Sequence, residues 1–195
     1  MENINYSDIE FCKDSVKFYG CKQKEEREKW IAGTFLENLG IKVSSEKLII
    51  GDDPPDVLYD MCCFEIKEIL DPGRRRHEEY KNDLARLKSS EKAVLEMESF
   101  TPTFISWDYV YKKVILTAQN AQTHYSTSFC SKTDLLIYYN RQEEIIKEPK
   151  LQLHPVDCDN LHWRSVSVLR SDQSRIVYIS KDVPDILKHT IDLLI

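Results

Sequence analysis

Two acids and a lysine in the N-terminal half of the chain could carry metal-assisted chemistry: Asp56, Glu65 and Lys67. Magnesium prefers hard oxygen ligands, commonly one or two carboxylates, with water and substrate phosphate in the remaining positions. A lysine beside such an ion can orient an attacking water and stabilise negative charge that develops on a phosphate. The three residue types together therefore predict hydrolysis of a phosphodiester bond, with Mg²⁺ or Mn²⁺ as the cofactor.

The elements expected around these residues would bring them together. Residues 56–59 and 62–70 both have strand character and are separated by a two-residue turn, so a hairpin would place the two acids side by side. Side chains at positions i and i+2 share one face of a strand, so Glu65 and Lys67 project together while Ile66 points into the other layer. Asp56 and Glu65 are the expected metal ligands, and the carbonyl of Ile66 is a candidate third.

An acid and a lysine two positions apart are weak evidence by themselves, because the chain contains two other such triplets, Glu79–Lys81 and Glu148–Lys150. The first lies in a charged helical stretch and the second contains a proline, so neither suits a central strand. Only Glu65–Lys67 follows a Pro-Asp pair and lies in a predicted strand. The alternative interpretation is a surface hairpin that carries an ordinary Glu–Lys cross-pair.

An acid on the first predicted helix, residues 21–39, could complete the metal site as a further catalytic group. At about 100° per residue, Glu28 falls within the apolar face of that helix. A carboxylate there usually needs a partner or a metal. The alternative is that Glu28 lies in the first turns, where it complements the helix dipole and still reaches water.

Three consecutive arginines follow the predicted catalytic strand: Arg74, Arg75 and Arg76. At the start of a helix they are placed to bind phosphates that flank the scissile one, which makes them candidate substrate-binding residues. Solvated surface charge is the alternative for each of them.

The order of predicted elements is a helix, three strands, helices, a strand, and then an appended strand pair and helix. This order predicts an α/β fold with a mixed central sheet flanked by helices. The length of 195 residues fits a single domain, with a core of about residues 21–140 and appended elements in residues 160–195. The expected elements outside the hairpin are strands at 41–43, 47–50, 135–139, 165–169 and 175–179, helices at 74–98, 107–125 and from 184, and a loop at 143–160.

Composition and charge narrow the functional classes. The net charge of −6 argues against a dedicated nucleic-acid coat protein. The sequence lacks both an apolar stretch of the roughly 20 residues that a bilayer requires and a secretory signal, so we expect a cytoplasmic protein without a membrane partner. The six cysteines show no CxxC spacing and are expected to be reduced thiols. No GxGxxG, P-loop or GxSxG motif offers another chemistry.

Three stretches carry a resemblance to a known family: EREKWIAGTFLENLGIKV (Glu26–Val43), PPDVLY (Pro54–Tyr59) and FEIKEILDPGRRR (Phe64–Arg76). They resemble a bacterial family of endonuclease-like proteins called domain of unknown function 1780. The resemblance implies the PD-(D/E)xK nuclease superfamily, whose restriction-endonuclease-like core has the element order predicted above. It would assign metal-site roles to Asp56, Glu65 and Lys67.

In nucleases of this type an acid on the first helix commonly completes the site, and either Glu28 or Glu26 could be its equivalent. Tyr125 follows Gln122 by three residues, one fewer than the helix Gln–Tyr pair of some RecB-like nucleases, and is not included in the predicted site. The expected partner is nucleic acid, with DNA favoured, and a homodimer is an option because many such nucleases pair to cut two strands. The sequence leaves open whether the substrate is DNA or RNA and which strand or structure is preferred. It also allows an inactive module with the nuclease fold that binds nucleic acid or protein.

Overall fold

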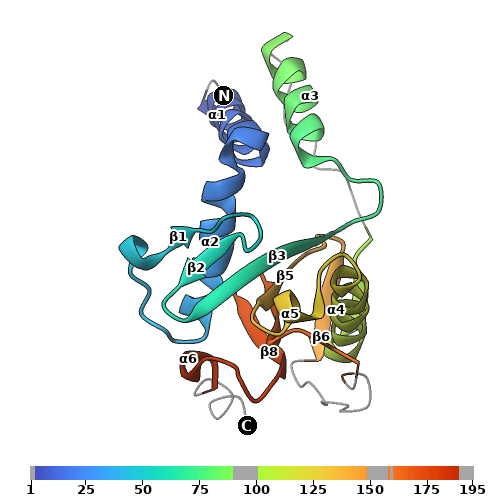
Figure 1. Cartoon of the computed structure of the whole chain (residues 1–195). Coiled ribbons are helices and arrows are strands. Elements are labelled where there is room, and N and C mark those ends of the chain that lie inside the picture. Colours follow the sequence, from blue (N-terminus) through green and yellow to red (C-terminus); the bar gives the residue numbers. More distant parts are fainter. Residues whose placement is uncertain (1–2, 90–100, 149–157, 159, 189–195) are drawn as a thin grey trace. The chain divides into compact units, whose positions relative to one another are not determined.

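The computed structural model in Figure 1 describes most of the chain, namely residues 3–89, 101–148, 158 and 160–188. It comprises two compact units, and each is described by itself below. The first unit is Met1–Arg27 with Pro72–Thr101, and the second is Glu28–Asp71 with Pro102–Ile195. The expectation of a single domain stays a prediction.

The first unit is helical. Helix α1 (Asn3–Tyr19) packs against helix α3 (Arg76–Ser89), and the short 3-10 helix η1 (Cys21–Gln23) follows α1. The predicted helix at 74–98 therefore begins at Arg76, and its part beyond Ser89 lies outside the described residues. Helix α1 was not predicted, because its first turn has no acidic residue to mark a helix start.

The second unit is built on a six-stranded sheet. The strands run in the order β1-β2-β3-β5-β7-β8. The pairs β1–β2, β2–β3 and β7–β8 are antiparallel, whereas β3–β5 and β5–β7 are parallel. The predicted α/β class with a mixed central sheet is therefore confirmed. The strand bounds are β1 Ile49–Ile50, β2 Val57–Tyr59, β3 Cys62–Leu70, β5 Asp134–Asn140, β7 Ser165–Arg170 and β8 Gln173–Ile179.

Helices cover both faces of this sheet, as Figure 1 shows. Helix α2 (Lys24–Asn38) buries Ile31 and Phe35 against one face, in a core that includes Phe64 of β3. Helix α4 (Trp107–Gln122) buries its apolar side in a second core on the other face, with Leu135 of β5. Two short helices complete the unit, α5 (Thr127–Cys130) and α6 (Asp185–Lys188).

The terminal helix was predicted from residue 184 onward, and its apolar positions Ile191 and Leu194 lie outside the described residues. All six cysteines are free. No helix in the described part of the chain combines the length and apolarity needed to cross a lipid bilayer.

Two local expectations are wrong. Residues 41–43 form no strand, and the 3-10 helix η2 (Ser45–Lys47) follows them. Within the predicted loop at 143–160, strand β6 (Glu144–Glu148) pairs in parallel with β4 (Thr103–Ser106) as a separate two-stranded sheet. Ile145 and Ile146 lie opposite Phe104 and Ile105, a pairing over 40 residues of sequence that local patterns do not reveal.

Candidate active site

Asp56 is fixed beside β3 by the β2–β3 hairpin. The hairpin turns through two residues, with Tyr59 opposite Cys62 and Val57 opposite Phe64. The backbone N–H of Asp56 donates to the carbonyl of Phe64 at 2.9 Å. Two residues further along β3, the Asp56 carboxylate takes the place of a paired strand as the hydrogen-bond acceptor. Its Oδ2 atom accepts the backbone N–H of Ile66 at 2.8 Å. Asp56 is only 4% exposed, so the carboxylate is held against the edge of β3.

The loop before Asp56 has a conformation that requires glycine at its start. The N–H of Gly51 donates to the Asp56 carbonyl at 2.9 Å, and the N–H of Asp53 donates to Pro55 at 3.2 Å. A Cβ atom added at Gly51 would lie 2.0 Å from the Pro55 carbonyl oxygen, far inside contact distance. The peptide bonds Asp53–Pro54 and Pro54–Pro55 are both cis. This loop therefore sets the position at which the chain enters Asp56.

Glu65 and Lys67 lie on the same face of β3, as strand alternation predicted. The Lys67 Nζ atom donates to Glu65 Oε1 at 2.7 Å. The same oxygen accepts the hydroxyl of Tyr125 at 2.6 Å, and Lys67 also donates to that hydroxyl oxygen at 3.0 Å. Glu65, Lys67 and Tyr125 thus form a closed triangle of hydrogen bonds. Glu65 is 2% exposed whereas the Lys67 side chain is 36% exposed, so the triangle has one buried and one solvent-facing end.

Tyr125 is held in place by other aromatic residues. Its ring stacks on Phe129 with centroids 4.9 Å apart and meets Trp163 edge-on at 5.6 Å. Trp163 is itself anchored, because its indole N–H donates to the carbonyl of Ala118 at 3.0 Å. The sequence analysis left Tyr125 out of the site. The Gln122 spacing was not the useful signal, since Gln122 instead bonds the segment at 160–162.

The ionisation of the triangle follows from burial and hydrogen bonding. Burial lowers the pKa of Lys67, but the hydrogen bonds and charge of Glu65 and Tyr125 outweigh it, and the pKa ends well above its ordinary value of 10.5. Burial raises the pKa of the Tyr125 phenol, and its hydrogen bond to Glu65 raises it further. At neutral pH the site therefore contains an ammonium and a neutral phenol.

One atom of the site shows how a cation would fit. Glu65 Oε2 is buried and has no hydrogen-bond partner among the described residues; it is called the open oxygen below. An unsatisfied buried oxygen on a carboxylate costs about 1–3 kcal/mol, and a bound cation would remove that cost. N–H and C=O of one strand residue point to the same side, so the Ile66 carbonyl faces the edge that bears Asp56.

The donor set is small. No group of three or more His, Cys, Asp or Glu side chains within the described segments is arranged to hold a metal ion. A magnesium ion here would rest on Asp56, Glu65 and the Ile66 carbonyl, with water and substrate phosphate as its other ligands, which is a common arrangement for Mg²⁺.

Glu28 is buried on α2, at 8% exposure, as its place on the apolar face predicted, whereas Glu26 is exposed. Helix α2 packs on the face of the sheet toward which Phe64 points, and Glu65 lies on the opposite face. The role of Glu28 in a metal site stays a prediction.

The three arginines belong to the first unit and differ in environment. Arg74 forms an ion pair with Glu79 at 2.9 Å. Arg75 is 77% exposed, with Glu78 at 3.6 Å. Arg76 is buried, and its guanidinium lies 5.2 Å from the centre of the Tyr19 ring. Their phosphate-binding role stays a prediction, which the exposure of Arg75 suits best.

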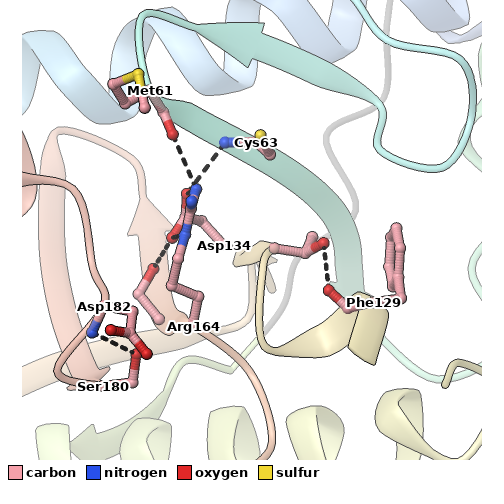
Figure 2. Close-up of polar contacts among 9 residues, drawn as sticks. Met61, Cys63, Phe129, Asp134, Arg164, Ser180 and Asp182 are labelled. Carbon is pink, nitrogen blue, oxygen red and sulfur yellow. Dashed lines mark hydrogen bonds and ion pairs between the residues drawn. The ribbon is translucent and has the colours of Figure 1, made fainter. Parts of the chain in front are cut away.

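A second polar network anchors the hairpin that carries Asp56 and Glu65. Asp134, 1% exposed at the start of β5, forms an ion pair with Arg164 and accepts the Cys63 backbone N–H at 3.1 Å. It also accepts the hydroxyl of Ser165 at 2.8 Å. Figure 2 shows Arg164 between Asp134 and the carbonyl of Met61, to which it donates at 3.0 Å. Three strands and the hairpin turn are thus tied to one buried carboxylate.

Comparison with known proteins places the chain in a family. The family model described as "Putative endonuclease, protein of unknown function (DUF1780)" matches residues 7–195. The chain belongs to this family. The DUF1780 resemblance noted in three short stretches therefore extends over nearly the whole chain, including Tyr125 and Asp134.

One solved structure has a similar fold. It is a protein of unknown function from Pseudomonas aeruginosa strain PAO1 that is described as a member of the monooxygenase superfamily. The two chains share 21% identity with a TM-score of 0.66, and the match covers 97% of this chain and 92% of that one. At this identity the likeness shows the fold alone. No curated protein matches the chain.

Proposed function

We propose that this DUF1780 protein is a metal-dependent nuclease of the PD-(D/E)xK type that hydrolyses phosphodiester bonds with Mg²⁺ or Mn²⁺. The open oxygen of Glu65 carries the proposal. One oxygen of this buried carboxylate is bound by Lys67 and Tyr125, and a second acid lies beside the same strand, so the open oxygen suits a divalent cation. The succession of α2, β1, β2, β3, α4 and β5 supports it, because these elements keep the order expected for the core of such nucleases, with α3 and β4 inserted before α4 and α5 inserted before β5.

The residues of the site would divide the work. Asp56 and Glu65 would hold the cation, with the Ile66 carbonyl beside them. The ion, when bound, would neutralise charge on the scissile phosphate and make an attacking water a better nucleophile. Lys67, protonated and partly exposed, would orient that water and stabilise negative charge that develops on the phosphate. Tyr125 would keep the Lys67 ammonium in position through its hydroxyl.

The proposed substrate is nucleic acid, with DNA favoured, and Arg75 is the best-exposed of the three arginines that would bind its phosphates. A homodimer would suit cleavage of both strands of a duplex. The proposed place of action is the cytoplasm.

The test is cleavage of plasmid DNA and of labelled oligonucleotides in Mg²⁺ or Mn²⁺, with EDTA as the blank. Lys67→Met and Asp56→Asn should each lower the rate at least 100-fold, because each removes a group that acts on the reacting phosphate. Lys181→Met is the control, since Lys181 is an exposed lysine of the same unit as Lys67 and takes no part in the proposed site. It should cleave like the wild type.

Wild-type activity in both Lys67→Met and Asp56→Asn would refute the assignment. If the wild-type protein binds Mn²⁺ in calorimetry but cleaves nothing, the fold serves as a binding module and the catalytic proposal fails. Loss of activity in Lys181→Met would show that the assay reports general damage to the protein.

A further inference from the structure

A groove in the helical first unit is lined by aromatic side chains. It has a volume of about 490 Å³ and lies between α1 and α3, with Phe11, Phe18, Tyr19 and Tyr80 in its walls. The rings contact one another in sequence. Phe11 meets Tyr80 edge-on at 5.8 Å, Tyr80 stacks on Tyr19 at 5.6 Å with planes 7° apart, and Tyr19 meets Phe18 at 5.1 Å. The groove therefore offers ring faces and edges already fixed in place.

The groove has an exposed apolar end and charged neighbours. Phe11 is 54% exposed, so much of its ring is accessible to a ligand. Lys17 and Asp14 line the same groove and are exposed. The Arg76 guanidinium lies against the ring of Tyr19. A flat apolar ligand with charge at its edge would match such a surface.

Charge complementarity indicates which ligand. The segment 74–89, which supplies Tyr80 and forms one wall of the groove, has six basic and three acidic residues, a net charge of +3 in a chain of net charge −6. Positive charge is thus concentrated beside the aromatic groove. Aromatic rings next to basic side chains form a stacking platform for unpaired bases, whose phosphates the basic groups neutralise.

We infer that the groove between α1 and α3 binds unpaired nucleotides of a single-stranded nucleic acid. One base stacks on the exposed Phe11 ring, and Lys17 with the basic residues of α3 neutralises the neighbouring phosphates. Duplex DNA fits less well, because its bases are already stacked on each other. The choice of nucleic acid as the ligand rests on the proposed nuclease function.

The test measures binding alone, by fluorescence anisotropy in EDTA so that no cleavage occurs. The probes are a labelled 15-nucleotide oligothymidylate, an abasic strand of the same length, and a duplex of that length. The oligothymidylate should bind at least about tenfold tighter than the abasic strand, because only the former has bases to stack. Phe11→Ala should remove that difference, and Phe11→Trp should keep it.

Phe104→Ala is the matched control, because Phe104 is equally exposed, at 53%, but belongs to the other unit. It should bind like the wild type. Equal affinity for the oligothymidylate and the abasic strand, or wild-type binding by Phe11→Ala, would overturn the inference. The inference would also be overturned if a second copy of the chain covers the groove. In that case Phe11→Ala would dissociate a dimer and leave oligothymidylate binding unchanged.

The outcomes for the groove and for the catalytic site are separable. If Phe11→Ala binds normally while cleavage still depends on Lys67, the groove inference fails and the nuclease proposal stands. If binding depends on Phe11 but the wild-type protein cleaves no nucleic acid in Mg²⁺ or Mn²⁺, the groove inference stands and the nuclease proposal fails.

Discussion

Replacing Glu65 by glutamine tests whether the open oxygen holds a cation. Glutamine keeps the shape of the side chain and an oxygen that can accept from Lys67 and Tyr125, but it removes the negative charge. Without metal, two effects oppose each other. The hydrogen bond from Lys67 weakens and the NH₂ group that replaces the open oxygen has no acceptor, while the cost of burying a charge disappears. We therefore expect the metal-free variant to be within about 1 kcal/mol of the wild type in unfolding free energy.

The difference should appear when metal is added. A ligand that binds only the folded state stabilises it by RT ln(1 + [L]/Kd), so 10 mM Mg²⁺ on a site with a Kd of about 1 mM adds about 1.4 kcal/mol. For a chain of this size that gain raises Tm by about 3–6 °C. Glu65→Gln should show almost none of this gain, because Mg²⁺ binds carboxylates far better than amides in a site with so few protein ligands.

The assay is thermal unfolding followed by circular dichroism, with NaCl of equal ionic strength in place of MgCl₂ as the blank. Asp56→Asn should behave like Glu65→Gln. A Tm gain in Glu65→Gln as large as that of the wild type would place any bound ion elsewhere. If neither Mg²⁺ nor Mn²⁺ stabilises the wild type, the metal-site reasoning is refuted.

Three further predictions concern the groups around Glu65. Lys67→Met should lower the unfolding free energy equally at pH 7 and pH 9. The raised pKa keeps the Lys67 ammonium charged below 10.5, and its stabilising effect is lost only as the pH rises through the folded-state pKa. Urea unfolding at both pH values would reveal any difference. Tyr125→Phe should lower kcat about tenfold with KM nearly unchanged, since it removes the hydroxyl that positions Lys67, and a change in KM alone would contradict this. Arg164→Met should cost about 3–5 kcal/mol in urea unfolding by leaving buried Asp134 unpaired, and a loss below about 1 kcal/mol would show that the pair is not what anchors the hairpin.

The part of the site that local sequence rules determine could be predicted. Strand alternation places Glu65 and Lys67 on one face of β3 and Ile66 on the other, and the two-residue turn after Tyr59 brings Asp56 to the edge of the same strand. Both rules depend only on residues close in sequence. The apolar pattern of α2 likewise predicted that Glu28 would be buried.

The rest depends on contacts between distant segments. Tyr125 reaches Glu65 across 60 positions of sequence, and its ring is fixed by Trp163, a further 38 positions along. Nothing in the residues adjacent to Tyr125 indicates that its hydroxyl meets a carboxylate. Strand β6 was missed for the same reason, because its partner β4 lies over 40 positions earlier.

The burial of Glu65 argues against the ordinary surface hairpin that the sequence also allowed, and it favours the proposed metal site. A Glu–Lys cross-pair on a surface hairpin gains little, about 0–1 kcal/mol, and both its side chains stay in water. Here the carboxylate is 2% exposed, so its desolvation is nearly complete, while Lys67 and Tyr125 satisfy only one of its two oxygens. The proposed cation would satisfy the open oxygen and offset the desolvation of this carboxylate, which a cross-pair on a surface hairpin does not require.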